Sequence, residues 1–236
     1  YQPQVETSLK SITGIEALIR WNHPELGVIT PEQFIPLAEE TGLIVTIGEW
    51  VIETACHQRQ LWMNNGLKDE PICVNISPQQ LKQPNFIQTI KNILAKTGLN
   101  SYLLELEIKE TFISEDTDFA LKILRELNEL GIRIALDDFG SGASALGYLK
   151  QFPFNTLKID RPVVDNILNN IQEKAMVGAI ITISNSLDSL RVVAEGVEEK
   201  AIMDQLIQLG CQEIQGNWLT KPLDSGKMTQ FLNDAS

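Results

Sequence analysis

The residues of this sequence best suited to chemistry are carboxylates, amides and a lysine that interrupt or end short apolar runs. A parallel strand covered on both faces is almost continuously apolar, so a polar side chain inside one needs a reason. Each such residue, taken singly, has an ordinary interpretation as a helix cap or a solvent-facing position. Their recurrence from run to run indicates a functional site. The positions are Glu16, Asn75, Glu105, Glu107, Asp137, Asp138, Lys158, Asp160, Glu195 and Gln215.

Carboxylates gathered in one low-dielectric place repel one another unless cations lie among them. Hard oxygen ligands without histidine or cysteine favour Mg²⁺ or Mn²⁺ over zinc or copper. The adjacent Asp137 and Asp138 suggest two ions, with one carboxylate bridging them. Two such ions about 3.5–4 Å apart can bind a phosphodiester and lower the pKa of a bridging water towards ~7. Lys158 would then orient the nucleophile or stabilise the transition state.

The elements that must position these residues alternate between strand-like and helix-like segments. This alternation, with eight strand candidates, predicts an α/β fold of the (β/α)₈ TIM-barrel type, in which the polar residues late in the strands converge on the C-terminal mouth. An open doubly wound sheet is the alternative. The expected strands are Tyr1–Glu6, Ile12–Arg20, Ile72–Ser77, Leu103–Ile108, Ile132–Asp137, Thr156–Asp160, Val192–Glu195 and Cys211–Gln215. The expected helices are Pro31–Glu40, Glu49–Asn64, Asn85–Lys96, Asp116–Leu130, Ser144–Gln151, Ile171–Ser186, Lys200–Leu209 and Ser225–Asn233.

Composition narrows the class of protein. The 236 residues are 43% hydrophobic and 21% charged, which is typical of a soluble globular chain, and no linker divides residues 1–236, so we expect a single domain. A net charge of −12 opposes binding to nucleic acid polymers and anionic membranes. No apolar run is long enough to cross a bilayer, and three dispersed cysteines with two histidines favour free thiols over a disulfide framework or zinc site. We therefore expect a cytoplasmic domain without membrane contact.

Two short motifs offer competing interpretations. Asp138-Phe139-Gly140 matches the metal-binding triplet of protein kinases, but no catalytic-loop motif or glycine-rich ATP loop accompanies it. The stretch from Gly140 to Ala145 fits the loose dinucleotide-binding pattern after a strand. The preceding pair of aspartates would repel a pyrophosphate there, so a loop beside the metal ligands is the better interpretation.

Further motifs resemble those of a known family. Glu16-Ala17-Leu18 followed by Arg20 is similar to the signature of EAL domains, phosphodiesterases for the bacterial second messenger cyclic di-GMP. The resemblance runs from Tyr1-Gln2-Pro3 to Lys221-Pro222-Leu223. Between these ends lie Val74-Asn75-Ile76-Ser77, Glu107-Ile108-Lys109-Glu110, Asp137-Asp138-Phe139-Gly140, Leu157-Lys158-Ile159-Asp160-Arg161, Ala194-Glu195-Gly196-Val197-Glu198 and Gln215-Gly216.

The resemblance implies a (β/α)₈ barrel with one antiparallel strand, expected to be the first. It implies two Mg²⁺ or Mn²⁺ ions, one held by Glu16, Asn75, Glu107 and Asp137 and the other by Asp137, Asp138 and Glu195. Lys158 resembles the catalytic lysine, with Glu195, Gln215 and Asp160 completing the catalytic floor. For the substrate, Arg20 resembles the phosphate-binding arginine, and Gln2, Leu18 and Asp160 line the nucleotide groove. Glu110 and Glu198 resemble acids that anchor loops, and the implied reaction opens cyclic di-GMP to linear pGpG.

The chain departs from the family pattern near the fifth expected strand. Lys109 stands where a threonine is usual, and Ala143 and Ala145 replace a tyrosine and a serine. One alternative is a cyclic di-GMP receptor that is catalytically weak or silent. Another is a metal-dependent lyase or isomerase of a small carboxylate, because acidic strand ends and a lysine also suit enolate chemistry. The resemblance also implies a homodimer, and a domain cut from a longer signalling protein with GGDEF or sensory modules.

Overall fold

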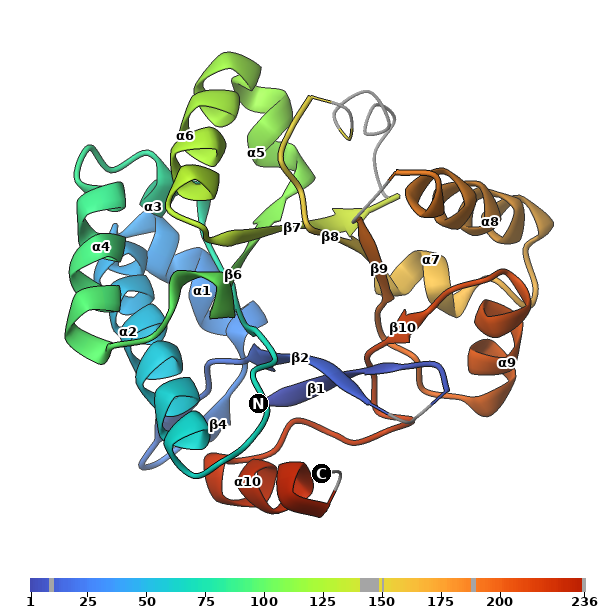
Figure 1. The fold of residues 1–236 in the computed structure, drawn as a ribbon, viewed down its shortest axis with the longest axis horizontal. Coiled ribbons are helices and arrows are strands. Elements are labelled where there is room, and N and C mark those ends of the chain that lie inside the picture. Colours follow the sequence, from blue (N-terminus) through green and yellow to red (C-terminus); the bar gives the residue numbers. More distant parts are fainter. Residues whose placement is uncertain (9–10, 141–148, 150, 188–189, 235–236) are drawn as a thin grey trace.

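Eight strands close into a barrel in the computed structural model, which describes residues 1–8, 11–140, 149, 151–187 and 190–234. Around the barrel the strand order is β1-β10-β9-β8-β7-β6-β5-β2 (Figure 1). The expected (β/α)₈ barrel is therefore confirmed. The barrel strands are β1 Gln2–Glu6, β2 Ile12–Ala17, β5 Ile72–Asn75, β6 Leu104–Lys109, β7 Arg133–Phe139, β8 Thr156–Ile159, β9 Arg191–Ala194 and β10 Glu213–Ile214.

Strand β1 is antiparallel to both of its neighbours, while the other barrel strands pair in parallel. The expectation that the first strand is the antiparallel one is confirmed. Its register places Gln2 opposite Glu16 and Gln4 opposite Gly14. A β-carbon on Gly14 would lie 2.5 Å from Oε1 of Gln4, so the glycine makes room for this amide inside the barrel. Gln2, the first residue of β1, consequently lies at the mouth of the barrel, beside the end of β2.

Helices surround the barrel on its outer side (Figure 1). Their ends follow local sequence signals: Thr30 caps the helix that begins with Pro31, and Gly98 takes the left-handed conformation after the helix that ends at Thr97. Within the described residues, no helix has both the length and the apolar character to cross a membrane. The helices are α1 Pro31–Glu40, α2 Leu43–Asn64, α3 Pro78–Leu81, α4 Phe86–Thr97, α5 Glu110–Glu115, α6 Thr117–Glu129, α7 Arg161–Asp165, α8 Ile171–Asn185, α9 Lys200–Gln208 and α10 Ser225–Asp234.

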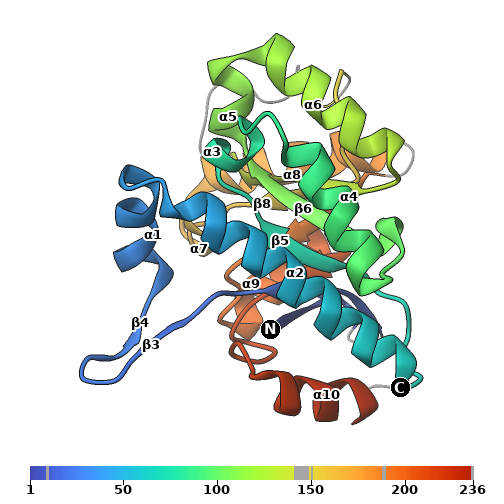
Figure 2. The ribbon, with the colours of Figure 1, turned by 90° about the vertical axis from the view of Figure 1, so that its left-hand side faces the viewer.

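Some elements differ from the expected ones. The hairpin of β3 Trp21–His23 and β4 Gly27–Ile29 projects from the barrel ahead of α1 (Figure 2). Its strands of three residues are too short to give a clear period. The short helices α3, α5 and α7 were also not expected, and β2 ends at Ala17 rather than Arg20. Most of the expected helix Ser144–Gln151, and the loop with Ala143 and Ala145, lie outside the described residues.

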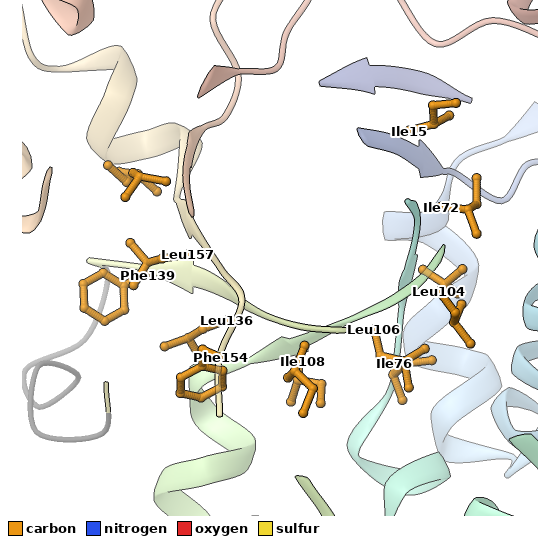
Figure 3. Packing of buried hydrophobic residues seen from close by; sticks show 14 of the residues in the cluster. Ile15, Ile72, Ile76, Leu104, Leu106, Ile108, Leu136, Phe139, Phe154 and Leu157 are labelled. Carbon is orange, nitrogen blue, oxygen red and sulfur yellow. The ribbon is translucent and has the colours of Figure 1, made fainter. Parts of the chain in front are cut away.

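The main hydrophobic core fills the layer between strands and helices. Apolar residues that alternate along the strands, such as Leu104, Leu106 and Ile108 on β6, belong to one buried cluster with helix residues. Figure 3 shows part of this cluster, with Leu136 of β7 beside Phe154 and Leu157 of β8 near Phe139. The alternate positions on the same strands point into the barrel, which is where the polar residues lie.

The lower interior of the barrel holds a network of ion pairs. Glu105 accepts hydrogen bonds from Arg133 Nε at 2.9 Å and Thr156 Oγ1 at 3.0 Å. Arg191 Nε donates to Glu213 Oε1 at 2.9 Å, and its Nη1 lies 3.8 Å from Glu105 Oε2. The expectation that Glu105 converges on the mouth with Glu107 is therefore wrong, because Glu105 lies two residues earlier on β6 and is paired in this lower layer. The network stabilises the barrel and leaves the mouth to other residues.

Candidate functional site

The mouth of the barrel is centred on Lys158, whose side chain on β8 is 1% exposed. Its Nζ lies 2.6 Å from Glu195 Oε1 and 2.7 Å from Glu107 Oε2. Glu16 Oε2 and Asp137 Oδ1 lie farther away, at 3.6 and 3.9 Å. One buried cation is thus surrounded by carboxylates from β2, β6 and β7 and from the end of β9, as the parallel strands of the barrel require.

Amide side chains orient Glu16 on its other sides. Asn75 Nδ2 donates to Glu16 Oε1 at 2.6 Å, and Gln215 Nε2 donates to Glu16 Oε2. Gln215 is held in turn by contacts with β1: its Nε2 also donates to Gln2 Oε1 at 3.2 Å, and its Oε1 accepts from Gln4 Nε2 at 3.0 Å. The antiparallel first strand therefore fixes the floor of the site.

The proton affinities in this cluster are strongly shifted. Burial raises the pKa of Glu107 well above its ordinary value, and repulsion from Glu16 adds to this effect. Burial likewise raises the pKa of Asp137, and that of Glu195 to about 8. Burial would lower the pKa of Lys158, but Glu107, Glu16 and the other carboxylates raise it well above its ordinary value. These shifts favour the charged form of Lys158 and oppose ionisation of Glu107, Asp137 and Glu195, an effect that a bound cation would reverse.

The donor set fits divalent metal ions. Oε1 of Glu107 and Oδ1 of Asp137 are buried and accept no hydrogen bond from the described residues. Unpaired carboxylate oxygens in a buried place cost free energy unless a cation satisfies them. With Glu16 and Asn75 alongside, the cluster supplies the oxygen ligands that Mg²⁺ and Mn²⁺ prefer.

Asp138 lies at the edge of this cluster. It is the only described residue other than glycine with a positive φ, of 57°, and it falls where the β7–β8 register shifts between Leu136 and Phe139. Because the backbone is irregular here, the side chain of Asp138 need not follow the in-and-out alternation of β7. Lys109 Nζ lies 2.6 Å from Asp138 Oδ2. Burial would lower the pKa of Lys109, but the hydrogen bond to Asp138 raises it.

An open pocket of about 240 Å³ adjoins the cluster. Arg161, which the sequence assigned no role, lies at its rim, and a β-carbon on Gly196 would come within 2.3 Å of Arg161 Cγ. The glycine thus allows the arginine to lie across the loop after β9, where its Nη2 pairs with Glu198 at 3.0 Å. The lining residues are Gln2, Glu16, Leu18, Asp137, Lys158, Arg161, Glu195, Gly196, Glu198, Gln215, Gly216 and Asn217.

Six expected site residues lie outside this lining: Asn75, Glu107 and Asp138, described above, and Arg20, Asp160 and Glu110. Arg20 is exposed, and its Nη1 donates to the carbonyl of Ile19 at 2.8 Å. Asp160 follows β8 as the N-terminal cap residue of α7, and burial raises its pKa. Glu110 begins α5, and burial raises its pKa. The loop that Glu110 was expected to anchor lies outside the described residues.

Among the described residues, one group of three possible ligand side chains has its ligand atoms close together, and it shares Glu107 with the mouth. Ligand atoms of Cys73, Glu105 and Glu107 all lie within 4.8 Å of one another. Glu105 is already paired with Arg133, and burial raises the pKa of the Cys73 thiol well above its ordinary value. A protonated thiol and a neutralised carboxylate are poor ligands for a divalent ion, so the carboxylates at the mouth are the better site.

Curated proteins are similar to this chain in sequence. The curated protein "Bifunctional diguanylate cyclase/cyclic di-GMP phosphodiesterase MucR" of Pseudomonas aeruginosa is 42% identical over 97% of this chain and 33% of its own length. "Signaling protein YkoW" of Bacillus subtilis is 41% identical over 98% of this chain and 29% of its own length. The chain therefore spans about a third of these relatives.

The fold is also that of a solved relative. The structure described as "PaMucR Phosphodiesterase, c-di-GMP complex" superimposes with a TM-score of 0.93 at 42% identity, covering 97% of this chain and 92% of that one. The family description "EAL domain" matches residues 1–222. On this match and the identity with its relatives, the chain belongs to the EAL domain family.

Proposed function

We propose that this chain hydrolyses one phosphodiester bond of cyclic di-GMP, giving linear pGpG, with the help of two Mg²⁺ or Mn²⁺ ions. The observation that carries the proposal is the position of Lys158, buried among Glu16, Glu107, Asp137 and Glu195 beside an open pocket. Family membership and the phosphodiesterase activity named for MucR support it.

Glu16, Asn75, Glu107 and Asp137 would hold one ion, and Asp137, Asp138 and Glu195 the other. When bound, such ions supply an acidified water and neutralise charge on the phosphate. The fit rests on the hard oxygen donors and on the Glu107 and Asp137 oxygens that accept no hydrogen bond from the described residues. It also explains why an acidic mouth, in a chain of net charge −12, would accept an anion.

The chain's own groups would position the reactants. Lys158 would donate a hydrogen bond to the attacking water or to a phosphoryl oxygen, since its ammonium is fixed among the carboxylates. Gln215 would hold Glu16 in place through the same hydrogen bond that it donates now. Gln2 and Leu18 line the pocket and would bound the nucleotide groove. Arg20 would reach the phosphate by reorienting its exposed side chain.

The remaining proposals concern the whole protein. The relatives are about three times as long as this chain, and MucR is named as a diguanylate cyclase as well as a phosphodiesterase. We propose a single cytoplasmic EAL domain within a longer signalling protein that carries GGDEF or sensory modules and forms a homodimer.

A direct assay of turnover tests the proposed activity. Purified protein is incubated with cyclic di-GMP and Mg²⁺ or Mn²⁺, and products are separated by chromatography, with Glu16→Ala and Lys158→Ala for comparison. We expect metal-dependent formation of pGpG by the wild type, and a loss of at least ~100-fold in both variants. Equal inactivity of all three proteins, with nucleotide binding retained, would overturn the proposal.

A catalytically silent receptor is the second candidate. Lys109 stands at the edge of the metal cluster and pairs with Asp138, which favours weak occupancy of one ion site. Tight binding of cyclic di-GMP in the presence of a chelator, without turnover when metal is added, would support this candidate.

A further inference from the structure

We infer that the Lys109 ammonium occupies the place beside Asp138 where a second divalent ion would bind, so that this ion binds in competition with Lys109. The inference rests on the proposed two-ion site and adds a regulator of its occupancy. Lys109 is the last residue of β6, and its register partner on β7 is Asp137. Its side chain therefore starts at the rim of the cluster, next to both aspartates.

The contact between Lys109 and Asp138 is a close one. Lys109 Nζ lies 2.6 Å from Asp138 Oδ2, within the range of a strong charge-assisted hydrogen bond. Asp138 holds an unfavourable backbone conformation, with a φ of 57°, which is uncommon outside glycine. A carboxylate presented in this way, beside Asp137, is set up to hold a cation, and the lysine supplies one from within the chain.

Exposure separates Lys109 from the other lysine of the site. The side chain of Lys109 is 56% exposed and that of Asp138 is 33% exposed, whereas Lys158 is 1% exposed. Lys109 can leave its partner for water far more readily than Lys158 can, because exposed ion pairs contribute less to stability than buried ones that must be kept paired. Lys158 is held by carboxylates on several sides. The site thus combines a fixed cation with a displaceable one.

Displacement of Lys109 has a cost for metal binding. An incoming ion must break the pair with Asp138 and then remain near a positive charge on the same rim. Both effects weaken binding of the second ion, by roughly tenfold in total for charges this exposed. The first ion, at Glu16 and Asn75 on the other side of the mouth, is affected less because screening grows with distance.

Binding of Mn²⁺ alone tests the inference, without nucleotide and without turnover. Free Mn²⁺ is followed by electron paramagnetic resonance, with calorimetry for the two affinities, in the wild type, Lys109→Met and Lys109→Arg. Lys82→Met is the matched control, since Lys82 is half exposed and pairs with Glu115 at 2.9 Å away from the pocket lining. We expect Lys109→Met to bind the second ion about tenfold more tightly, and the Lys109→Arg and Lys82→Met variants to match the wild type.

The outcomes separate this inference from the proposed function. Equal or weaker binding of the second ion by Lys109→Met, including its absence from every protein, would overturn the inference. Tighter binding in Lys109→Met together with no hydrolysis of cyclic di-GMP by any variant would leave the inference standing and reject the proposed function. Unchanged melting temperatures of the variants show that the comparison is between folded proteins.

Discussion

Lys158 Nζ lies 2.7 Å from Glu107 Oε2, and both side chains are buried within the mouth of the barrel. A buried ion pair of this kind offsets the cost of removing both charges from water only when further partners surround it. Here Glu195 supplies a second close contact to the lysine. The pair is therefore both a structural element and the centre of the proposed chemistry.

Removal of the Lys158 charge should make folding depend on metal. In Lys158→Met the carboxylates lose their counter-cation, so at pH 8 and with a chelator the free energy of unfolding should fall by about 3 kcal/mol. Added Mg²⁺ should restore more stability to the variant than to the wild type. Urea denaturation measures both effects, with Lys200→Met, which disrupts an exposed pair with Asp204, as the control. A variant as stable as the wild type in chelator would contradict this prediction.

The metal-free protein should lose stability as the pH rises from 5 to 8. Glu195 has a pKa of about 8 against an ordinary value of 4.5, so the folded state keeps a proton that the unfolded state releases in this range. The contribution of Glu195 to the stability of the folded protein is then greatest below pH 4.5 and falls as the pH approaches 8. Glu107 and Asp137 act in the same direction.

The pH dependence is measured by urea denaturation with a chelator, in the wild type and in Glu195→Gln. The variant should show a shallower loss, since one of the titrating groups is gone. Metal binding should release protons near pH 7, which calorimetry in two buffers detects. Stability that rises between pH 5 and 8 in the metal-free wild type would be inconsistent with these shifts.

The lower ion-pair network should affect stability and leave turnover unchanged. Arg191→Met removes the partner of Glu213 and weakens the charge balance around Glu105, which should cost about 3 kcal/mol. Neither residue lines the pocket, so kcat/KM of the folded variant should stay within about twofold of the wild type. Loss of activity without loss of stability would mean that this network belongs to the site.

Arg161 should contribute to binding of the nucleotide. It lies at the rim of the pocket across Gly196, where a phosphate or guanine base would meet its guanidinium. Arg161→Ala should raise KM about tenfold, the effect of losing one hydrogen bond to a charged group, with little change in kcat. Arg125→Ala, at an exposed position of α6, is the control. A lowered kcat at unchanged KM would instead give Arg161 a part in the chemical step.

The sequence predicted the barrel and the residues of the mouth because both follow from local pattern. The alternation of apolar residues on β6 identifies it as a strand. Polar residues at the C-terminal ends of parallel strands meet at one mouth in any (β/α)₈ barrel, so their convergence does not depend on how the core packs. The residues that the structure brings together around Lys158, namely Glu16, Glu107, Asp137 and Glu195, are among those that this reasoning selected.

Other features depend on strand register and backbone geometry, which cannot be predicted from the pattern of residue types. Glu105 and Glu107 share one face of β6, and only the stagger of the barrel places one with Arg133 and the other with Lys158. Asp138 reaches the edge of the site through its positive φ, an irregularity that no pattern of residue types specifies. Arg161 can line the pocket because Gly196, which follows a different strand, has no side chain to block it. The placement of Arg161 therefore depends on tertiary structure.

The location of bound ions tests the account most directly. Crystals of this chain grown with Mn²⁺ give anomalous difference maps that show where the metal lies. The account predicts two peaks at the mouth, one among Glu16, Asn75, Glu107 and Asp137 and one beside Asp137 and Asp138. A single peak between Cys73 and Glu105, or no peak among the carboxylates around Lys158, would contradict it.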